Sequence, residues 1–142
     1  MGMSLETLYE TFEVFIQAEM VGVFWTGVIY TFEDRPFNEN IEPTEQESWI
    51  KFAIHPGVTR RSEIRRGGLG IRYGTIIVDV NVPRPPFSDK RQGAIYADQL
   101  AGVLKNSEMT GIAVEEPETR YRQPRDYDWL KHVVTVPFWT TT

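Results

Sequence analysis

The feature that most constrains the fold is a long alternation of apolar and polar residues between positions 71 and 82. Successive side chains of a β-strand point to opposite faces, so a strand here gathers its β-branched residues on one face. That face carries Ile76, Val78, Val80 and Val82. The other face is half polar, because it includes Asp79 and Asn81. A sheet containing this strand must cover its apolar face and leaves the second face to solvent or to a partner.

Other segments carry weaker strand signals. Ile50, Phe52 and Ile54 alternate with more polar neighbours, and Pro56-Gly57 then predicts a turn that ends the segment. After the long strand, the prolines of residues 83–86 stop pairing, because proline has no N–H to donate. The further predicted strands are residues 23–32, 49–55, 59–66, 112–114, 119–125 and 130–138.

Two segments have the period of a helix instead. The first begins after Ser4, a suitable N-cap, and stops near Gly22. Its apolar stripe is Leu5, Leu8, Phe12, Phe15 and Ile16. The second runs from a cap at Ser88 to about Leu104. Its stripe consists mostly of small residues, which let a helix lie close to a sheet: Ala94, Ala97, Leu100, Ala101 and Leu104.

The order of these elements is helix, strands, helix, strands. This order predicts an α+β fold with a mixed, mainly antiparallel sheet, two helices packed on one face, and extended loops. The 142 residues make about one domain, so we expect residues 1–142 to form a single unit. Two helices cover one sheet face, and the rest of the sheet needs solvent or a partner.

Composition excludes several classes of protein. No apolar run approaches the roughly 20 residues that span a bilayer, and the first residues lack the basic and apolar regions of a signal peptide. We therefore expect no membrane association. The chain has no cysteine, which removes disulfides, thiolate nucleophiles and zinc–thiolate sites.

The net charge of −5 is divided unequally along the chain. Residues 1–50 contain ten acidic residues and one basic residue, Arg35, whereas residues 51–142 contain 14 basic and 10 acidic residues. Such a split suits the complementary faces of a self-assembling subunit. The alternative is a solvated acidic helix and loop beside a basic hairpin.

Few residues are available for catalysis or for holding a cofactor. The only histidines, His55 and His132, have no serine within a few residues, and no Gly-x-Ser-x-Gly motif is present. The carboxylates of residues 115–116 and 126–128 lack the spacing of an EF-hand loop. The glycines of residues 67–70 lack the Lys-Ser/Thr of a P-loop. We predict no enzyme activity, no catalytic residue, no cofactor and no metal site.

A predicted basic hairpin is the most distinctive charged feature. It holds five arginines within 13 residues, opposed only by Glu63: Arg60, Arg61, Arg65, Arg66 and Arg72. Guanidinium groups bind phosphates and carboxylates through charge-assisted hydrogen bonds. Three interpretations stay open: docking on an acidic protein surface, contact with nucleic acid, and a solvated hairpin. One acidic surface is the 33–47 loop of a neighbouring copy, with Glu39, Glu42, Glu45 and Glu47.

Several segments together resemble the tail terminator family of tailed bacteriophages, from about Leu5 to Phe138. The first of these segments is the first amphipathic helix. The others come after it in chain order: Arg35-Pro36-Phe37, Trp49-Ile50-Lys51-Phe52 with Pro56-Gly57, Gly74-Thr75-Ile76-Ile77-Val78, Val80-Asn81-Val82-Pro83, Ala97-Asp98-Gln99-Leu100 and Val134-Thr135-Val136-Pro137-Phe138. These are core and turn residues without catalytic identity.

The resemblance implies a small structural protein of the virion tail, assembled in the host cytoplasm. Six copies would form a ring that caps the tail tube, ends its polymerisation and meets the head-side neck proteins. Its partners would be itself, the major tail tube protein and a neck or head-completion protein. Double-stranded DNA would pass through the channel without sequence-specific binding. The resemblance implies no enzyme activity or cofactor.

Two alternatives remain. The first is a neck or head-completion connector between portal and tail. The second, from another class, is a small hydrolytic or ligand-binding domain. In a ring subunit, residues 33–47, 57–70 and 84–88 are the candidate loops for gripping the tube.

Overall fold

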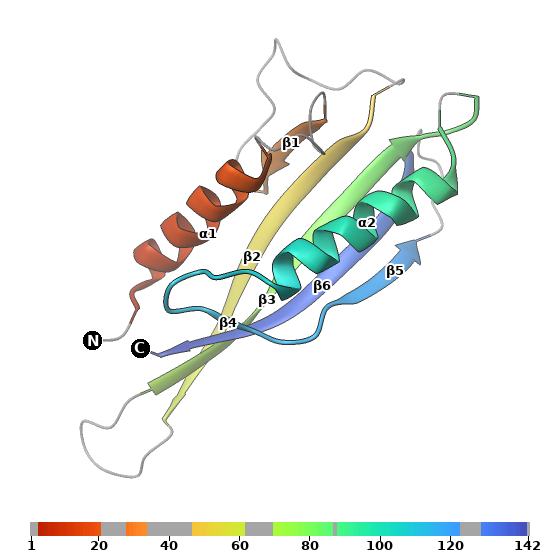
Figure 1. Cartoon of the computed structure of the whole chain (residues 1–142). Coiled ribbons are helices and arrows are strands. Elements are labelled where there is room, and N and C mark those ends of the chain that lie inside the picture. Colours follow the sequence, from red (N-terminus) through yellow and green to blue (C-terminus); the bar gives the residue numbers. More distant parts are fainter. Residues whose placement is uncertain are drawn as a thin grey trace.

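A computed structural model of the chain describes residues 3–20, 28–33, 47–61, 70–86, 88–122 and 129–141 (Figure 1). Within these residues two helices accompany a six-stranded sheet. In chain order the elements are α1 (Leu5–Met20), β1 (Ile29–Phe32), β2 (Trp49–Arg61), β3 (Gly70–Pro83), α2 (Lys90–Lys105), β4 (Ala113–Val114), β5 (Glu118–Arg122) and β6 (Trp129–Thr141). No helix in these ranges is long and apolar enough to cross a membrane.

The sheet is mainly antiparallel. Its strand order is β1-β2-β3-β6-β4, and β5 pairs with the same side of β6 as β4 does. The pairing of β1 with β2 is parallel, and the pairings of β3 with β2 and β6 are antiparallel. The predicted mixed, mainly antiparallel α+β fold is therefore confirmed.

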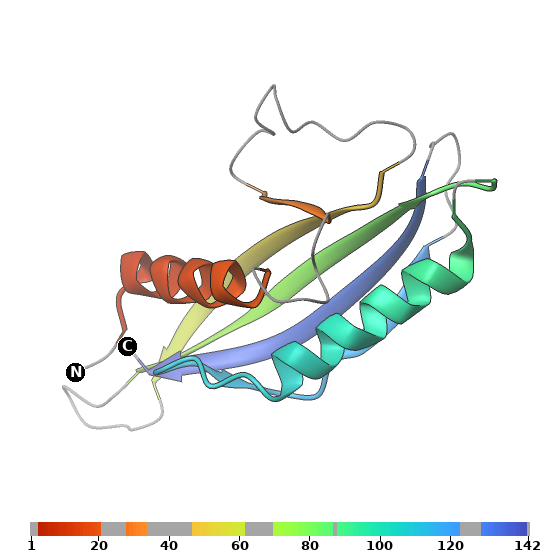
Figure 2. The ribbon, with the colours of Figure 1, turned by 45° about the horizontal axis from the view of Figure 1, so that its top comes forward.

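Both helices lie on one face of the sheet, as predicted (Figures 1 and 2). Helix α1 contacts β2, and α2 lies across β3, β5 and β6. Phe52 of β2, Val78 of β3 and Val134 of β6 are fully buried beneath the helices and lie opposite one another in the strand register. We call this side of the sheet the covered face and the opposite side the open face.

The starts of the two helices differ in how well sequence predicted them. Ser4 caps α1 as expected, because its Oγ accepts a hydrogen bond from the Thr7 N–H at 3.2 Å. Leu5, however, is 44% exposed, so the first residue of the predicted apolar stripe is not part of the buried core. The cap of α2 is Asp89 and not Ser88, and its Oδ1 accepts from the Gln92 N–H at 3.0 Å.

The predicted turn at Pro56-Gly57 is wrong. Strand β2 continues through both residues to Arg61, and the register with β3 shifts between Pro56 and Thr59. A β-bulge tolerates proline because it interrupts the ladder where the missing N–H would be needed. Gly57 is required for the same pairing, since a Cβ there would collide with the carbonyl oxygen of Tyr73. The separate strand predicted at 59–66 is in part the end of β2.

The outer segments of the predicted sheet are described only in part. Of the strand predicted at residues 23–32, the structure shows β1 at Ile29–Phe32, and residues 21–27 lie outside the described residues. In the last third, β5 and β6 overlap the predicted strands, whereas β4 has only two residues.

Candidate functional site on the open face

The open face is formed by every second residue of the long strands. The alternation that buries Val78 and Val80 on the covered face turns Asp79 to the other side. Lys51 of β2 lies opposite Asp79 in the register, and Val133 of β6 lies opposite Asp79 on its other side. No described helix covers this side of the sheet (Figure 2). The charges of β2 and β3 therefore meet on this side of the sheet.

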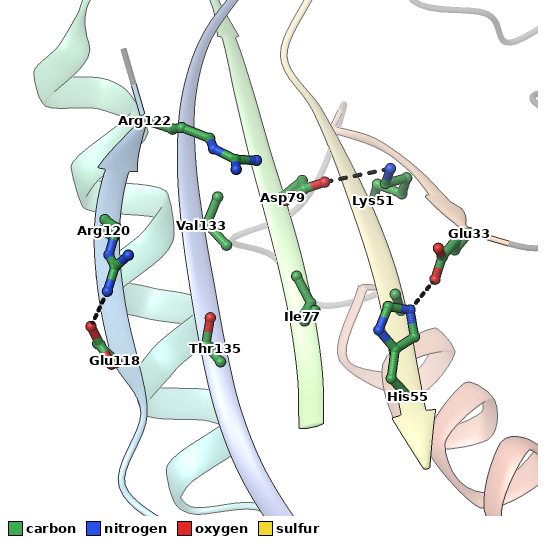
Figure 3. A pocket seen from close by; sticks show the side chains of 11 residues that line it. Glu33, Lys51, His55, Ile77, Asp79, Glu118, Arg120, Arg122, Val133 and Thr135 are labelled. Carbon is green, nitrogen blue, oxygen red and sulfur yellow. Dashed lines mark hydrogen bonds and ion pairs between the residues drawn. The ribbon is translucent and has the colours of Figure 1, made fainter. Parts of the chain in front are cut away.

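A hollow of about 440 Å³ lies on this face (Figure 3). We call it the polar hollow. Strands β2, β3, β5 and β6 and the turn after β1 contribute its walls. Its lining residues are Glu33, Lys51, Ala53, His55, Ile77, Asp79, Glu118, Arg120, Arg122, Val133 and Thr135.

One ion pair of the polar hollow crosses from β2 to β3, and another lies along the edge strand β5. Lys51 Nζ is 3.5 Å from Asp79 Oδ2, and the Asp79 side chain is only 15% exposed. Arg120 Nη2 donates to Glu118 Oε1 at 2.8 Å on the edge strand β5. The Arg120–Glu118 pair is well exposed, so it contributes little to stability. Asp79 is more enclosed, so removing Lys51 would leave a partly buried charge without its partner.

The third acidic residue of the polar hollow meets a histidine. His55 Nε2 donates to Glu33 Oε2 at 2.5 Å, and both side chains are about half exposed. A carboxylate in this position orients an imidazole, as in acid–base catalysis. The hydroxyl that lines the same hollow, Thr135, is on β6, separated from β2 by β3. Two strand spacings amount to roughly 9–10 Å, too far for His55 to activate it directly.

The residues that the structure describes contain no group of three or more side chains able to hold a metal ion. The three carboxylates of the polar hollow come from β3, β5 and the turn after β1, and each one meets a basic side chain. In their present pairs they do not offer the several converging oxygens that a hard cation takes.

Arg122 and Lys131 form a like-charged pair at the end of the open face. They lie directly opposite each other in the β5–β6 register. Neither has an ion-pair partner among the residues with described placement. Figure 3 shows the Arg122 side chain extending from β5 across β6. Like charges directly opposite on paired strands are destabilising, so this position attracts an anionic group.

The second histidine lies on the covered face, on the same side of β6 as Val134 and Val136. His132 is 4% exposed, and its ring centroid lies 5.0 Å from that of Tyr121. Burial lowers the pKa of the His132 imidazole, and the Lys90 ammonium lowers it further, while Asp98 acts in the opposite direction. Gly93 of α2 lies directly over the ring. His132 thus packs beneath a helix as a neutral side chain.

The predicted arginine cluster is only partly described. The backbones of Arg60 and Arg61 end β2, paired with Ile71 and Gly70, and their side chains lie outside the described residues, as do Arg65 and Arg66 entirely. Arg72 lies in β3 opposite Thr140 and is partly buried. Its Nη1 is enclosed and has no hydrogen-bond partner among described residues.

The predicted acidic partners are described at one position only. Glu39, Glu42 and Glu45 lie outside the described residues. Glu47 precedes β2, and its backbone carbonyl accepts a hydrogen bond from Trp129 Nε1 at 3.3 Å. A contact between the acidic loop and the arginine cluster therefore stays a prediction.

Sequence analysis missed the charged residues of the open face as a group. Alternation alone placed Asp79 on the half-polar side of its strand, and Lys51 on the polar side of the neighbouring one. Arg120 and Arg122 gave no such signal, because their segment carries no clear apolar period. Only the pairing of β5 with β6 brings them beside β3.

Comparison with known proteins shows the fold alone. No protein-family model matches this chain, and no curated protein matches it. Nineteen solved chains match. One of them, whose name is only an identifier, has a TM-score of 0.59 at 17% identity, over 99% of this chain and 97% of that chain. At this identity the likeness extends to the arrangement of helices and strands and carries no function.

Proposed function

We propose that this chain is a structural subunit of a phage virion that forms a ring at the end of the tail tube. The ring ends tube polymerisation and joins the tail to the neck. The observation that carries the proposal is the asymmetry of the sheet: one face is sealed by both helices, and the other is open and charged. A subunit of this form is suited to burying its second face against protein partners.

The family resemblance runs through the elements that build this sheet. Its motifs supply the buried rows of β2, β3 and β6, including Phe52, Val78 and Val136. The β2–β3 pair also extends past the ends of both helices (Figure 1). The end of this pair that includes Arg60 and Arg61 is the candidate contact with a neighbouring copy or a tube protein. Within the described residues, the edge strands of the sheet, β1, β4 and β5, are short, which limits unspecific pairing between sheets.

The test is reconstitution on tubes of the parent phage assembled without this protein. Negative-stain microscopy of tubes mixed with the pure chain is expected to show a cap at one end. Capped tubes are expected not to lengthen when tube protein is added. Tubes that stay uncapped and keep growing would overturn the proposal. Binding to tailless heads but not to tubes would favour the neck connector instead.

The arginine hairpin gives this experiment a matched pair of variants. Arg65→Glu/Arg66→Glu is expected to abolish capping, because it reverses two charges of the arginine cluster at residues 60–72. Arg84→Glu/Arg91→Glu makes the same change in net charge at two exposed positions away from it and is expected to cap normally. Equal capping by both variants would remove the hairpin from the contact.

One observation favours a second candidate, a small-molecule site in the polar hollow. The His55–Glu33 contact positions an imidazole at its wall. A screen with generic esters and nucleotides tests this candidate. Turnover or binding that is lost in His55→Ala would establish it, and no signal from the pure chain would reject it.

A further inference from the structure

We propose that the outer face of α1 in one copy docks on the Arg122–Lys131 pair of the next copy. This inference rests on the proposed function, because it names the contact that joins neighbouring subunits of the ring. Its two surfaces lie on different parts of the fold, and neither includes the arginine hairpin.

The donor surface is the acidic outer face of α1, which we define by Glu6, Glu10, Glu13, Tyr9 and Val14. The helix contains four glutamates and no lysine or arginine. At 100° per residue, Glu6, Glu10 and Glu13 form one strip, bordered by Tyr9 and Val14. Tyr9 is 46% exposed and Val14 is 59% exposed. Acidic side chains flanked by exposed apolar ones are suited to a contact with a partly apolar, cationic surface.

The acceptor surface is the Arg122–Lys131 pair with its aromatic neighbour. Trp129 is two residues before Lys131, so it lies on the same face of β6. Its ring makes an edge-on contact with Trp49 of β2, with centroids 5.9 Å apart. Two cations therefore stand beside a pair of indole rings. A carboxylate placed there relieves the repulsion between Arg122 and Lys131 and gains charge-assisted hydrogen bonds.

The fold places the two surfaces on opposite sides of the subunit. Helix α1 packs on β2, towards the β1 edge of the sheet, whereas β5 lies at the other edge, beyond β6. The helix also lies on the covered face, and the Arg122–Lys131 pair is on the open face. A contact between two different surfaces of identical subunits is heterologous, and such contacts close into rings when the rotation permits. A second copy supplies the required anionic helix without any further partner.

Reciprocal charge reversal tests the contact. Glu6→Lys/Glu10→Lys reverses the donor, and Arg122→Glu/Lys131→Glu reverses the acceptor. Each variant alone is expected to weaken self-association at least about tenfold in sedimentation velocity, because like charges then face each other. An equimolar mixture of the two variants is expected to associate again, since each copy then meets an oppositely charged neighbour. One chain carrying all four substitutions is expected to associate by itself.

Matched controls separate the contact from general charge effects. Glu108→Lys/Glu115→Lys changes two exposed acids outside α1 and is expected to leave association unchanged. Association of the wild type is expected to fall between 0.1 M and 1 M salt, because the Debye length shrinks from about 10 Å to about 3 Å. Circular dichroism checks that each variant is folded, and the rescue in the mixture provides a second check.

Three outcomes would overturn the proposed contact. They are a wild type that stays monomeric at millimolar concentration, variants that associate normally, and variants that fail to recover when mixed. None of these outcomes concerns tube capping, which the microscopy measures separately. A chain that caps tubes but fails the reversal test keeps the proposed function and loses this contact.

Discussion

Phe52 and Lys51 are neighbours in β2, and they belong to two surfaces held together by different forces. Phe52 is fully buried under the helices among apolar residues of three strands. Lys51 is on the open face, where its contact is an ion pair with Asp79 at 3.5 Å. Burial of apolar area supplies most of the free energy of folding, whereas exposed ion pairs supply little. The covered face therefore holds the fold together, and the open face contributes less to its stability.

The difference also separates the two histidines. His132 on the covered face is enclosed by α2 and Tyr121 and is kept neutral by burial. His55 on the open face is half exposed and donates to a carboxylate. The same residue type thus packs beneath a helix on one side of the sheet and binds a half-exposed carboxylate on the other.

Shortening one side chain on each face is expected to show the largest difference in stability between the two faces. Phe52→Ala is expected to lower the free energy of unfolding by about 3–5 kcal/mol, because it removes a buried ring and leaves a cavity. Arg120→Ala on the open face is expected to change it by no more than about 0.5 kcal/mol, since its ion pair is well exposed. Urea titration measures both values. Similar losses at the two positions would contradict the division between the faces.

Two glycines of α2 test how closely this helix packs on the covered face. A Cβ on Gly93 would lie 2.6 Å from His132 Nδ1, in a buried ring that cannot easily move. Gly93→Ala is therefore expected to cost about 1–3 kcal/mol by forcing the helix away from the sheet. A Cβ on Gly102 meets nothing within 4 Å. Gly102→Ala is expected to stabilise by up to about 1 kcal/mol through helix propensity.

Thermal unfolding of the two glycine variants provides the measurement. A melting temperature that falls in Gly93→Ala and rises in Gly102→Ala confirms the close packing of α2 on β6. A rise in both variants would show that the helix does not press on His132.

The smallest expected effect is a pH dependence of the free energy of unfolding, caused by His132 on the covered face. Unfolded His132 titrates near the ordinary value of 6.5, whereas the folded residue has a lowered pKa. Between the two values the unfolded state binds more protons, so stability falls as the pH is lowered below about 6.5. We expect His132→Gln to remove this component and His55→Gln to retain it. Urea titrations across this pH range measure the slope, and an unchanged slope in His132→Gln would contradict the assignment.

Much of the fold was predictable because the local period of apolar side chains determines each helix or strand and the face that it buries. The alternation around Val78 and Val80 predicted a strand with one buried face, and the stripes of Phe12 and Leu100 predicted helices packed on that face. The path of β2 through Pro56 was not predictable, since proline and glycine in sequence also indicate a turn. Their place in the strand depends on a bulge formed against β3.

The candidate site was less predictable than the fold. Glu33 and His55 are 22 positions apart, and Arg122 and Lys131 are separated by residues that include Pro124. Neither pair has a local motif, because each depends on which strands become neighbours. The charge split of the sequence pointed to an arginine hairpin and an acidic loop. Among the described residues, the charges that gather on one surface are those of β2, β3, β5 and β6.

The sequence by itself determined the class of fold, the two faces of each long strand and the scarcity of catalytic groups. These follow from the period of apolar side chains and from composition, both of which act locally. Only the tertiary structure decided the strand order, the continuation of β2 and the meeting of Arg122 with Lys131. Those features depend on hydrogen-bonded register between distant segments, and a shift of one residue would move each side chain to the other face.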